Sequence, residues 1–142
     1  MIAAFWDSSA LMPLCLNEAT TFACRALRAR FEVVVWWAAF VEIRSGIARS
    51  VRNSPLDADE HKAALDRLSE LRSSWDEMLP SNDLRELAGD LLDRYDLRAA
   101  DSLQLAAALV WCSRRPAGRV FICSDLRLGE AAELAGFTVV RP

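Results

Sequence analysis

The stretch "VVVWWAAFVEIRSG", Val33 to Gly46, contains the transition that decides the fold class. Its β-branched start is typical of a buried strand, and helical spacing follows from Trp37 to about Val51. One carboxylate, Glu42, comes directly after a run of nine apolar residues. Because an unpaired buried carboxylate is costly, Glu42 either turns outward to Arg49 or solvent, or serves a charged ligand.

The same change from strand to helix recurs along the chain. Strands are expected at Ile2–Trp6, in "EVVV", in Gly118–Asp125 and in "FTVVRP", with "DEMLP" as a brief further strand. Amphipathic or apolar helical segments separate them. Helices alternating with buried strands predict an α/β fold, with a mostly parallel sheet covered by helices on both faces. A chain of 142 residues matches one domain, residues 1–142.

A helical hairpin is expected between Trp37 and about Trp75. The first helix ends near Val51, "NSP" (Asn53 to Pro55) breaks the pattern, and "LDADEHKAALDRLSELRSSW" begins a second amphipathic helix. Trp36 and Trp37 stand near its base, where they form either part of the core or a protein interface.

Composition excludes several classes of protein. The longest apolar run, Val33 to Val41, is far shorter than the ~20 residues that span a bilayer, so no membrane helix is expected. The start "MIAAFWDSSAL" has no basic leader, and we expect a cytoplasmic protein. The net charge of −3 gives no global signature of nucleic-acid binding. Four cysteines are scattered singly in apolar surroundings and are expected to be buried thiols: Cys15, Cys24, Cys112 and Cys123.

Four acids are expected to meet at one edge of the sheet. Asp7 and Asp125 directly follow predicted strands, and Asp101 lies in the first turn of its helix. Glu42 is expected in the second turn of the helix after "VVV". Ligands of parallel sheets bind at the carboxyl ends of the strands. Singly, Asp7 and Asp125 could only cap helices and Asp101 could only complement a helix dipole.

Together, the four acids favour a metal site. Converging carboxylates repel one another unless a cation neutralises them, and oxygen ligands suit Mg²⁺ or Mn²⁺. Such an ion supports hydrolysis of phosphodiesters. The chain's one histidine, His61, lies in the exposed-looking stretch "DADEHK", so a serine–histidine–acid triad has little support.

The motifs around these acids resemble a known family. "FWDSSAL", "FVEIRSG", "LRAADSLQLAAAL" and "FICSDLRL" are similar to the four acidic motifs of PIN-domain ribonucleases, in that family's order and roughly its spacing. The resemblance covers essentially the whole chain, and the length is similar to that of small bacterial toxins of the VapC type.

The resemblance implies a three-layer α/β/α sandwich and a Mg²⁺- or Mn²⁺-dependent endoribonuclease. Asp7, Asp101 and Asp125 would hold the metal, Glu42 would join them directly or through a water, and Ser124 would hold a carboxylate or a water. In the toxin branch it further implies a homodimer inhibited by a VapB-type antitoxin, with the hairpin making partner contacts. Candidate phosphate contacts are Arg44, Arg49 and Arg98.

Two other functions stay open. A PIN-like module that only binds RNA or protein would usually have lost an acid, whereas all four are present. A phosphotransfer or phosphatase domain needs a nearby lysine, and the phosphatases a second aspartate two residues after the first. Here that position is Ser9, and the only lysine, Lys62, belongs to another helix.

Overall fold

A computed structural model describes residues 1–53 and 57–142 of the protein. Its centre is a five-stranded sheet in the order β3-β2-β1-β4-β5, in which every neighbouring pair is parallel. The strands are β1 (Ile2–Trp6), β2 (Phe31–Trp36), β3 (Asp76–Met78), β4 (Val120–Ile122) and β5 (Thr138–Val140). The predicted α/β fold with a parallel sheet is confirmed.

Helices occupy the segments where helical spacing predicts them. They are α1 (Ser8–Cys15), α2 (Thr21–Arg28), α3 (Ala39–Asn53), α4 (Ala58–Ser74), α5 (Asn82–Arg94), α6 (Ala99–Trp111) and α7 (Leu126–Ala135). The first turn of α3 differs from the prediction: the backbone N–H of Trp37 donates to the Met78 carbonyl at the end of β3, so the helix begins only at Ala39. Glu42 therefore lies in the first turn of α3 and not in the second.

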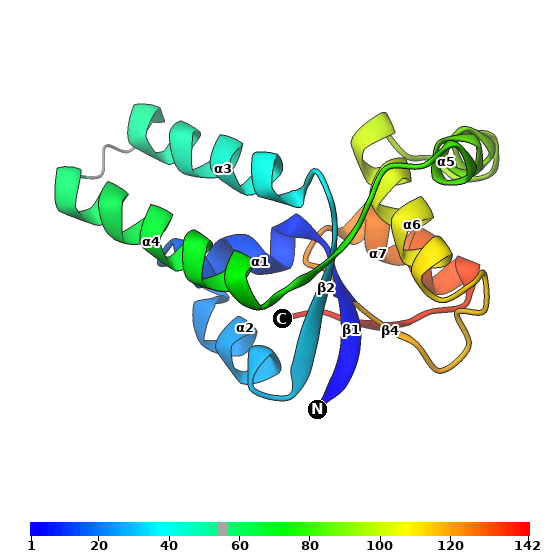
Figure 1. Ribbon diagram of the computed structural model, residues 1–142, viewed down its shortest axis with the longest axis horizontal. Helices are drawn as coiled ribbons and strands as arrows, with labels where there is room; N and C mark the ends of the chain where they lie inside the picture. The colour runs from blue at the N-terminus through cyan, green and yellow to red at the C-terminus, as the bar shows by residue number, and fades with distance from the viewer. Residues whose placement is uncertain (54–56) are drawn as a thin grey trace.

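Helices cover both faces of the sheet and form a three-layer α/β/α sandwich (Figure 1). Alternate side chains of a strand point to opposite faces, so neighbouring residues of β1 serve different cores. Phe5 packs with residues of α5, α6 and α7, whereas Ala4 and Trp6 pack with residues of α1, α2, α3 and α4. The predicted sandwich is thus present, and both helix layers reach the carboxyl edge of the sheet.

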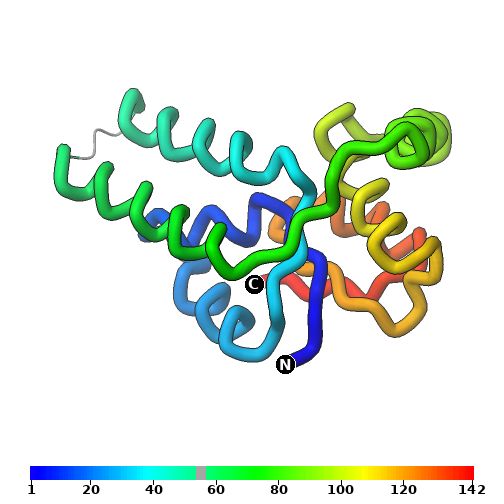
Figure 2. Tube along the Cα trace, in the orientation of Figure 1, coloured from blue at the N-terminus to red at the C-terminus, as the bar shows by residue number. Residues whose placement is uncertain are grey.

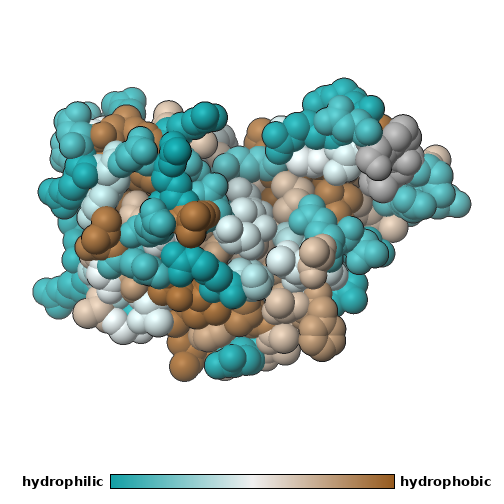
Figure 3. Space-filling view, turned by 180° about the vertical axis from the view of Figure 1, so that it is seen from behind, coloured by the Kyte–Doolittle hydropathy of each residue, from teal (hydrophilic) through white to brown (hydrophobic). Residues whose placement is uncertain are grey.

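The predicted helical hairpin is formed by α3 and α4, which lie side by side and project from the sheet (Figures 1 and 2). Asn53 is the last residue of α3, and the remainder of the expected "NSP" break lies outside the described residues. Seen from behind, hydrophilic residues cover most of this end of the molecule, and apolar residues gather along the lower edge of the view (Figure 3). At the hairpin base, Trp36 is in the core, whereas Trp37 is 51% exposed.

The expectation for the cysteines is confirmed, and the one for His61 is not. All four cysteines are buried and unpaired. Within residues 1–53 and 57–142, no helix is long and apolar enough to cross a membrane. His61, expected to be solvated, is half-buried on α4.

Candidate active site

The strand order places a ligand crevice at the ends of β1 and β4. The chain passes from β1 to its neighbour β2 on one side, while β4 lies against the other side of β1. Parallel sheets bind ligands at such reversals of strand order. Asp7 directly follows β1, and its backbone N–H donates to the Ile122 carbonyl of β4 at 2.9 Å. Asp125 follows β4 after a short loop, so the two aspartates come from adjacent strand ends.

Asp7 is the most buried of the four acids, with 4% of its surface exposed. It caps α1: its Oδ2 accepts from the backbone N–H of Ser9 at 3.2 Å and from the Ser9 hydroxyl at 2.5 Å. Burial raises the pKa of Asp7, the hydrogen bonds from Ser9 oppose this shift, and the charge of Asp125 adds to it. Asp7 therefore caps α1, as one interpretation of the sequence held, and it is also a carboxylate with a raised pKa at the sheet edge.

A hydroxyl and a thiol connect Asp7 to the loop after β4. The backbone N–H of Ser124 donates to Ser9 Oγ at 3.0 Å. The Cys123 thiol donates to the Asp125 carbonyl at 3.2 Å and lies 3.8 Å from Asp7 Oδ2. Ser124 thus reaches Asp7 through its backbone and through Ser9, while its own side chain is exposed.

Glu42 points from α3 toward the same edge. Its Oε1 accepts a hydrogen bond from Gln104 Nε2 of α6 at 2.8 Å. Burial and the nearby charge of Asp7 raise the pKa of Glu42 to about 7, although hydrogen bonds from Gln104 and Ser8 act in the opposite direction. Glu42 is thus half-buried and bonded to Gln104, and among the described residues it forms no ion pair with Arg49.

Asp101 and Asp125 complete the group from α6 and α7. Asp101 lies in the first turn of α6, and its pKa is raised by burial and by the charges of Asp125 and Asp7, against the opposing charges of Arg127 and Arg98. Asp125 caps α7, where its Oδ1 accepts from the Leu128 N–H at 2.8 Å.

One open depression of about 510 Å³ is lined by all four acids. Met12, Ser45 and Arg49 also line it. Four predicted site residues therefore meet, two from helices α3 and α6 and two from the chain after strands β1 and β4, as the sheet-edge rule predicts.

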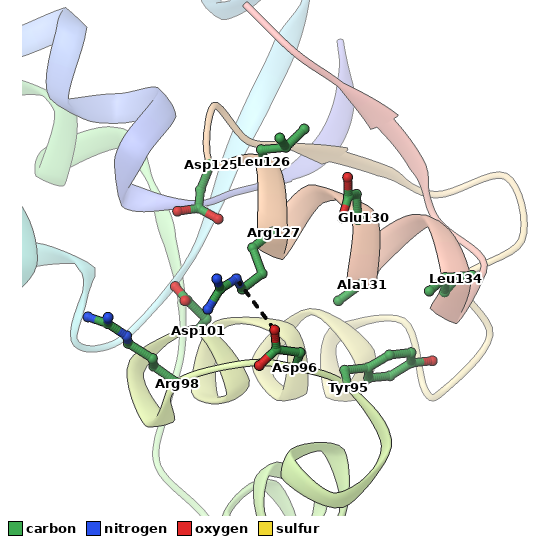
Figure 4. A pocket seen from close by; sticks show the side chains of 10 residues that line it. All are labelled: Tyr95, Asp96, Arg98, Asp101, Asp125, Leu126, Arg127, Glu130, Ala131 and Leu134. Atoms are coloured by element: carbon green, nitrogen blue, oxygen red, sulfur yellow. Dashed lines mark ion pairs between the residues drawn. The ribbon is translucent and has the colours of Figure 1, made fainter.

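A second depression of about 780 Å³ adjoins the first, since Asp101 and Asp125 line both. Figure 4 shows Arg98 and Arg127 on either side of Asp101, with Arg127 directed toward Asp96, 3.9 Å away. Tyr95 lies farther along this depression, away from the acids (Figure 4). We call this second depression the arginine cleft.

The chemistry of the four acids fits a divalent cation. Every candidate ligand is a carboxylate oxygen, and burial and then the charges of neighbouring acids raise the pKa of Asp7, Glu42 and Asp101, which a cation would oppose. As placed, no three His, Cys, Asp or Glu side chains of residues 1–53 and 57–142 stand at metal-binding spacing. Binding would therefore require rotation of side chains, which is open to the exposed Asp125 and the half-buried Asp101.

A family model named PIN domain matches residues 4–132 of the chain. The chain belongs to the PIN domain family. The matched segment contains all four acids of the site: Asp7, Glu42, Asp101 and Asp125. The family resemblance drawn from the four acidic motifs is thereby confirmed. Comparison with curated proteins gave no match.

Solved structures support the same fold. The chain is similar to VapC20 of Mycobacterium tuberculosis, with a TM-score of 0.68 and 20% identity, covering 99% of this chain and 100% of that one. PAE2754 of Pyrobaculum aerophilum also gives 0.68, with 19% identity over 98% and 90% of the two chains. VapBC2 of Rickettsia felis gives 0.66, with 9% identity over 99% and 98%. At these identities the likeness concerns the PIN fold.

Three residues at the site were not predicted. Ser9 and Gln104 bond to the acids, and Arg127 lies beside Asp101. Gln104 had a readable signal: it is the one polar residue of "LQLAAALVW", three residues after Asp101. Of the predicted phosphate contacts, Arg49 and Arg98 line the two depressions, whereas Arg44 lies over the Phe40 ring.

Proposed function

We propose that this PIN-domain protein is a divalent-metal-dependent endoribonuclease, and that it is the toxin of a toxin–antitoxin pair. The observation that carries the proposal is the single depression lined by Asp7, Glu42, Asp101 and Asp125 at the strand-order reversal of a PIN fold. The pKa of Asp7, Glu42 and Asp101 is raised by burial and by neighbouring acids, and a divalent cation with oxygen ligands would compensate this.

In this proposal Asp7, Asp101 and Asp125 hold Mg²⁺ or Mn²⁺, and Glu42 joins them directly or through a water. When bound, such an ion lowers the pKa of water and offsets the negative charge of a phosphodiester. Ser9 and Gln104 orient Asp7 and Glu42 through the hydrogen bonds described above. Burial of Asp7 and Glu42 excludes bulk water from one side of the depression.

Arginines beside the acids would bind the RNA backbone. Arg98 and Arg127 border the arginine cleft, and Arg49 borders the depression of the acids. A guanidinium forms forked hydrogen bonds to phosphate, so these side chains could hold phosphates on both sides of the cleaved bond. Local cations would serve here in place of a basic overall charge, since the net charge is −3.

The toxin role is supported by the names of similar structures. One is a toxin–antitoxin complex from Klebsiella pneumoniae, and VapC20 is described as a toxin that cleaves the sarcin–ricin loop. For the present chain we propose an RNA substrate met in the cytoplasm and a VapB-type antitoxin. These names do not identify the target RNA of this chain.

Partner contacts would involve the base of the α3–α4 hairpin. Trp37 is 51% exposed and Val41 is 61% exposed. Trp37 lies just before α3 and Val41 lies in its first turn, so both stand at the base of the hairpin, and exposed aromatic side chains are enriched at interfaces. We propose that this face contributes to a homodimer or to antitoxin binding. Light scattering that gives a monomer at micromolar concentration would exclude the dimer.

The decisive experiment measures cleavage of structured RNA with Mg²⁺ and with a chelator. Asp7→Asn, Asp101→Asn and Asp125→Asn should each abolish cleavage while circular dichroism reports an intact fold. Asparagine still caps a helix, so the first and last variants remove charge and keep the cap. Asp93→Asn, an exposed position on α5, is the control and should cleave normally. Activity in chelator, or in the three variants, would reject the proposal.

Expression in cells tests the toxin claim separately. Wild-type protein without a partner should arrest growth, and Asp7→Asn should relieve the arrest. Cleavage in vitro without any arrest would remove the toxin role and keep the nuclease.

A second candidate is a PIN-like module that binds RNA without cutting it. Arg98 and Arg127 in the arginine cleft could hold RNA phosphates without any metal. RNA binding that persists in chelator, with no cleavage under any metal, would select this alternative.

A further inference from the structure

Gln104 is a buried polar residue with an incomplete set of hydrogen bonds. It is fully buried on α6, in a helix whose other buried side chains are mostly alanine and leucine. Its Oε1 is the single buried side-chain nitrogen or oxygen without a hydrogen-bond partner among the described residues. Leaving a buried acceptor unpaired lowers the free energy of unfolding, so packing alone does not account for a glutamine at this position.

The other end of the same amide makes a specific contact. Gln104 follows Asp101 by three residues, which places both on one face of α6, with Gln104 one turn farther along the helix. Its Nε2 donates to Glu42 Oε1 at 2.8 Å. Glu42 belongs to α3 in the opposite helix layer. The hydrogen bond therefore crosses the carboxyl edge of the sheet and joins the two layers.

The direction of this bond follows from charge. An ionised carboxylate, the form that binds a metal, can only accept, so with Glu42 ionised Nε2 faces it and Oε1 faces away. The neighbouring charge of Asp7 disfavours an ionised Glu42 at this place, and the amide of Gln104 opposes that effect. Without the donor, the long side chain of Glu42 would gain by rotating away from Asp7 toward water.

We propose that Gln104 is a positioning residue whose side-chain amide holds Glu42 in the depression of the acids. The unpaired Oε1 lowers the free energy of unfolding and accompanies this role. This inference rests on the proposed function, because holding Glu42 matters only if Glu42 serves the metal. It predicts that one substitution acts differently on two properties. Removing the amide should weaken metal binding and should not lower the stability of the fold.

Gln104→Met tests this, because methionine is unbranched and similar in volume and has no amide. The dissociation constant for Mn²⁺ is measured by calorimetry, and the midpoint of urea unfolding is measured in EDTA. We expect affinity for Mn²⁺ to fall about 10-fold, the low end for partners of metal ligands, while the midpoint stays unchanged or rises. A lowered midpoint with unchanged affinity would make Gln104 an ordinary structural residue.

A double-mutant cycle shows whether Gln104 acts through Glu42. In a Glu42→Gln background, Gln104→Met should produce no further loss of Mn²⁺ affinity. A loss equal to that in the wild-type background would overturn the proposal. Thr21→Val is the control: Thr21 is also buried, and its hydroxyl donates to the Pro13 carbonyl at 2.7 Å, away from the acids. It should lower the unfolding midpoint and leave Mn²⁺ affinity unchanged.

A measurement without metal separates this inference from the nuclease proposal. In EDTA, the side-chain amide protons of Gln104 should exchange slowly with solvent, and their NMR shifts should change in Glu42→Ala but not in Arg49→Ala. Unchanged shifts in Glu42→Ala would show that the bond does not form and would overturn the inference. Wild-type protein that binds no Mn²⁺ while the amide signals behave as expected would instead overturn the metal-dependent function.

Discussion

The hydroxyl of Ser9 donates to Asp7 Oδ2 at 2.5 Å and accepts from the backbone N–H of Ser124 at 3.0 Å. One small side chain therefore connects the residue after β1 with the loop after β4. Because Ser9 Oγ accepts the hydrogen bond from Ser124, its own proton points toward the carboxylate. Ser9 therefore favours the charged form of Asp7. This agrees with the direction in which its hydrogen bonds act on the pKa of Asp7.

Ser9→Ala should impair the site more than the fold. The pKa of Asp7 should rise further, because the substitution removes a hydrogen bond that opposes the effect of burial. We expect metal affinity to fall about 10- to 100-fold and the free energy of unfolding to fall by about 1 kcal/mol. Calorimetry and urea unfolding measure the two quantities. Ser73→Ala, which removes an exposed hydroxyl on α4, is the control, and an equal loss of affinity there would contradict the prediction.

Stability of the metal-free protein should fall as the pH rises. The pKa of Glu42 is about 7 in the folded chain, above its ordinary value of 4.5. Between these values the folded state binds more protons than the unfolded state, so this group's contribution to stability is present below pH about 4.5 and is lost toward pH 7. The raised pKa values of Asp7 and Asp101 act with the same sign.

Thermal unfolding in EDTA at pH 5, 6, 7 and 8 measures this dependence. Glu42→Gln should flatten the fall between pH 5 and 7, because the amide does not titrate. An unchanged slope in that variant would mean that Glu42 titrates normally.

The order of helices and strands could be predicted because it depends on local patterns. Apolar runs of strand length and helical spacing are properties of neighbouring residues, and both are preserved in the fold. The first turn of α3 could not be predicted, because it depends on a hydrogen bond from Trp37 to Met78, which is distant in sequence. The exposure of Trp37 beside the buried Trp36 could not be predicted either, because both tryptophans belong to one apolar run.

The acids of the site could be predicted because topology places them. A residue that directly follows a parallel strand lies at the carboxyl edge, whatever the order of the strands. Ser9, Gln104 and Arg127 escape this rule, since their roles depend on which side chain each meets across the sheet edge. Such contacts follow from the packing of α1, α6 and α7 against the rest of the fold.

Metal binding should stabilise the folded protein through the acids. An ion at 100 times its dissociation constant adds about 2.7 kcal/mol to the free energy of unfolding, which corresponds to a rise in Tm of roughly 5–10 °C. We expect this rise with Mg²⁺ or Mn²⁺ at pH 8 and its loss in Asp7→Asn and Asp101→Asn. Asp93→Asn, exposed on α5, should respond as the wild type does. A full rise in Asp101→Asn would place the ion elsewhere.

Arg98 and Arg127 should contribute to binding of the RNA rather than to the chemical step. Both border the arginine cleft and flank Asp101 (Figure 4). Arg98→Ala and Arg127→Ala should each raise KM several-fold, and each should reduce the slope of log affinity against log salt by about 1.

The assay is run at pH 8, because both guanidiniums lower the pKa of Asp101 and their removal would otherwise leave more of it protonated. Arg115→Ala, an exposed position beyond the other end of α6, is the matched control. A fall in kcat with unchanged KM would assign these arginines to the acids and not to the substrate.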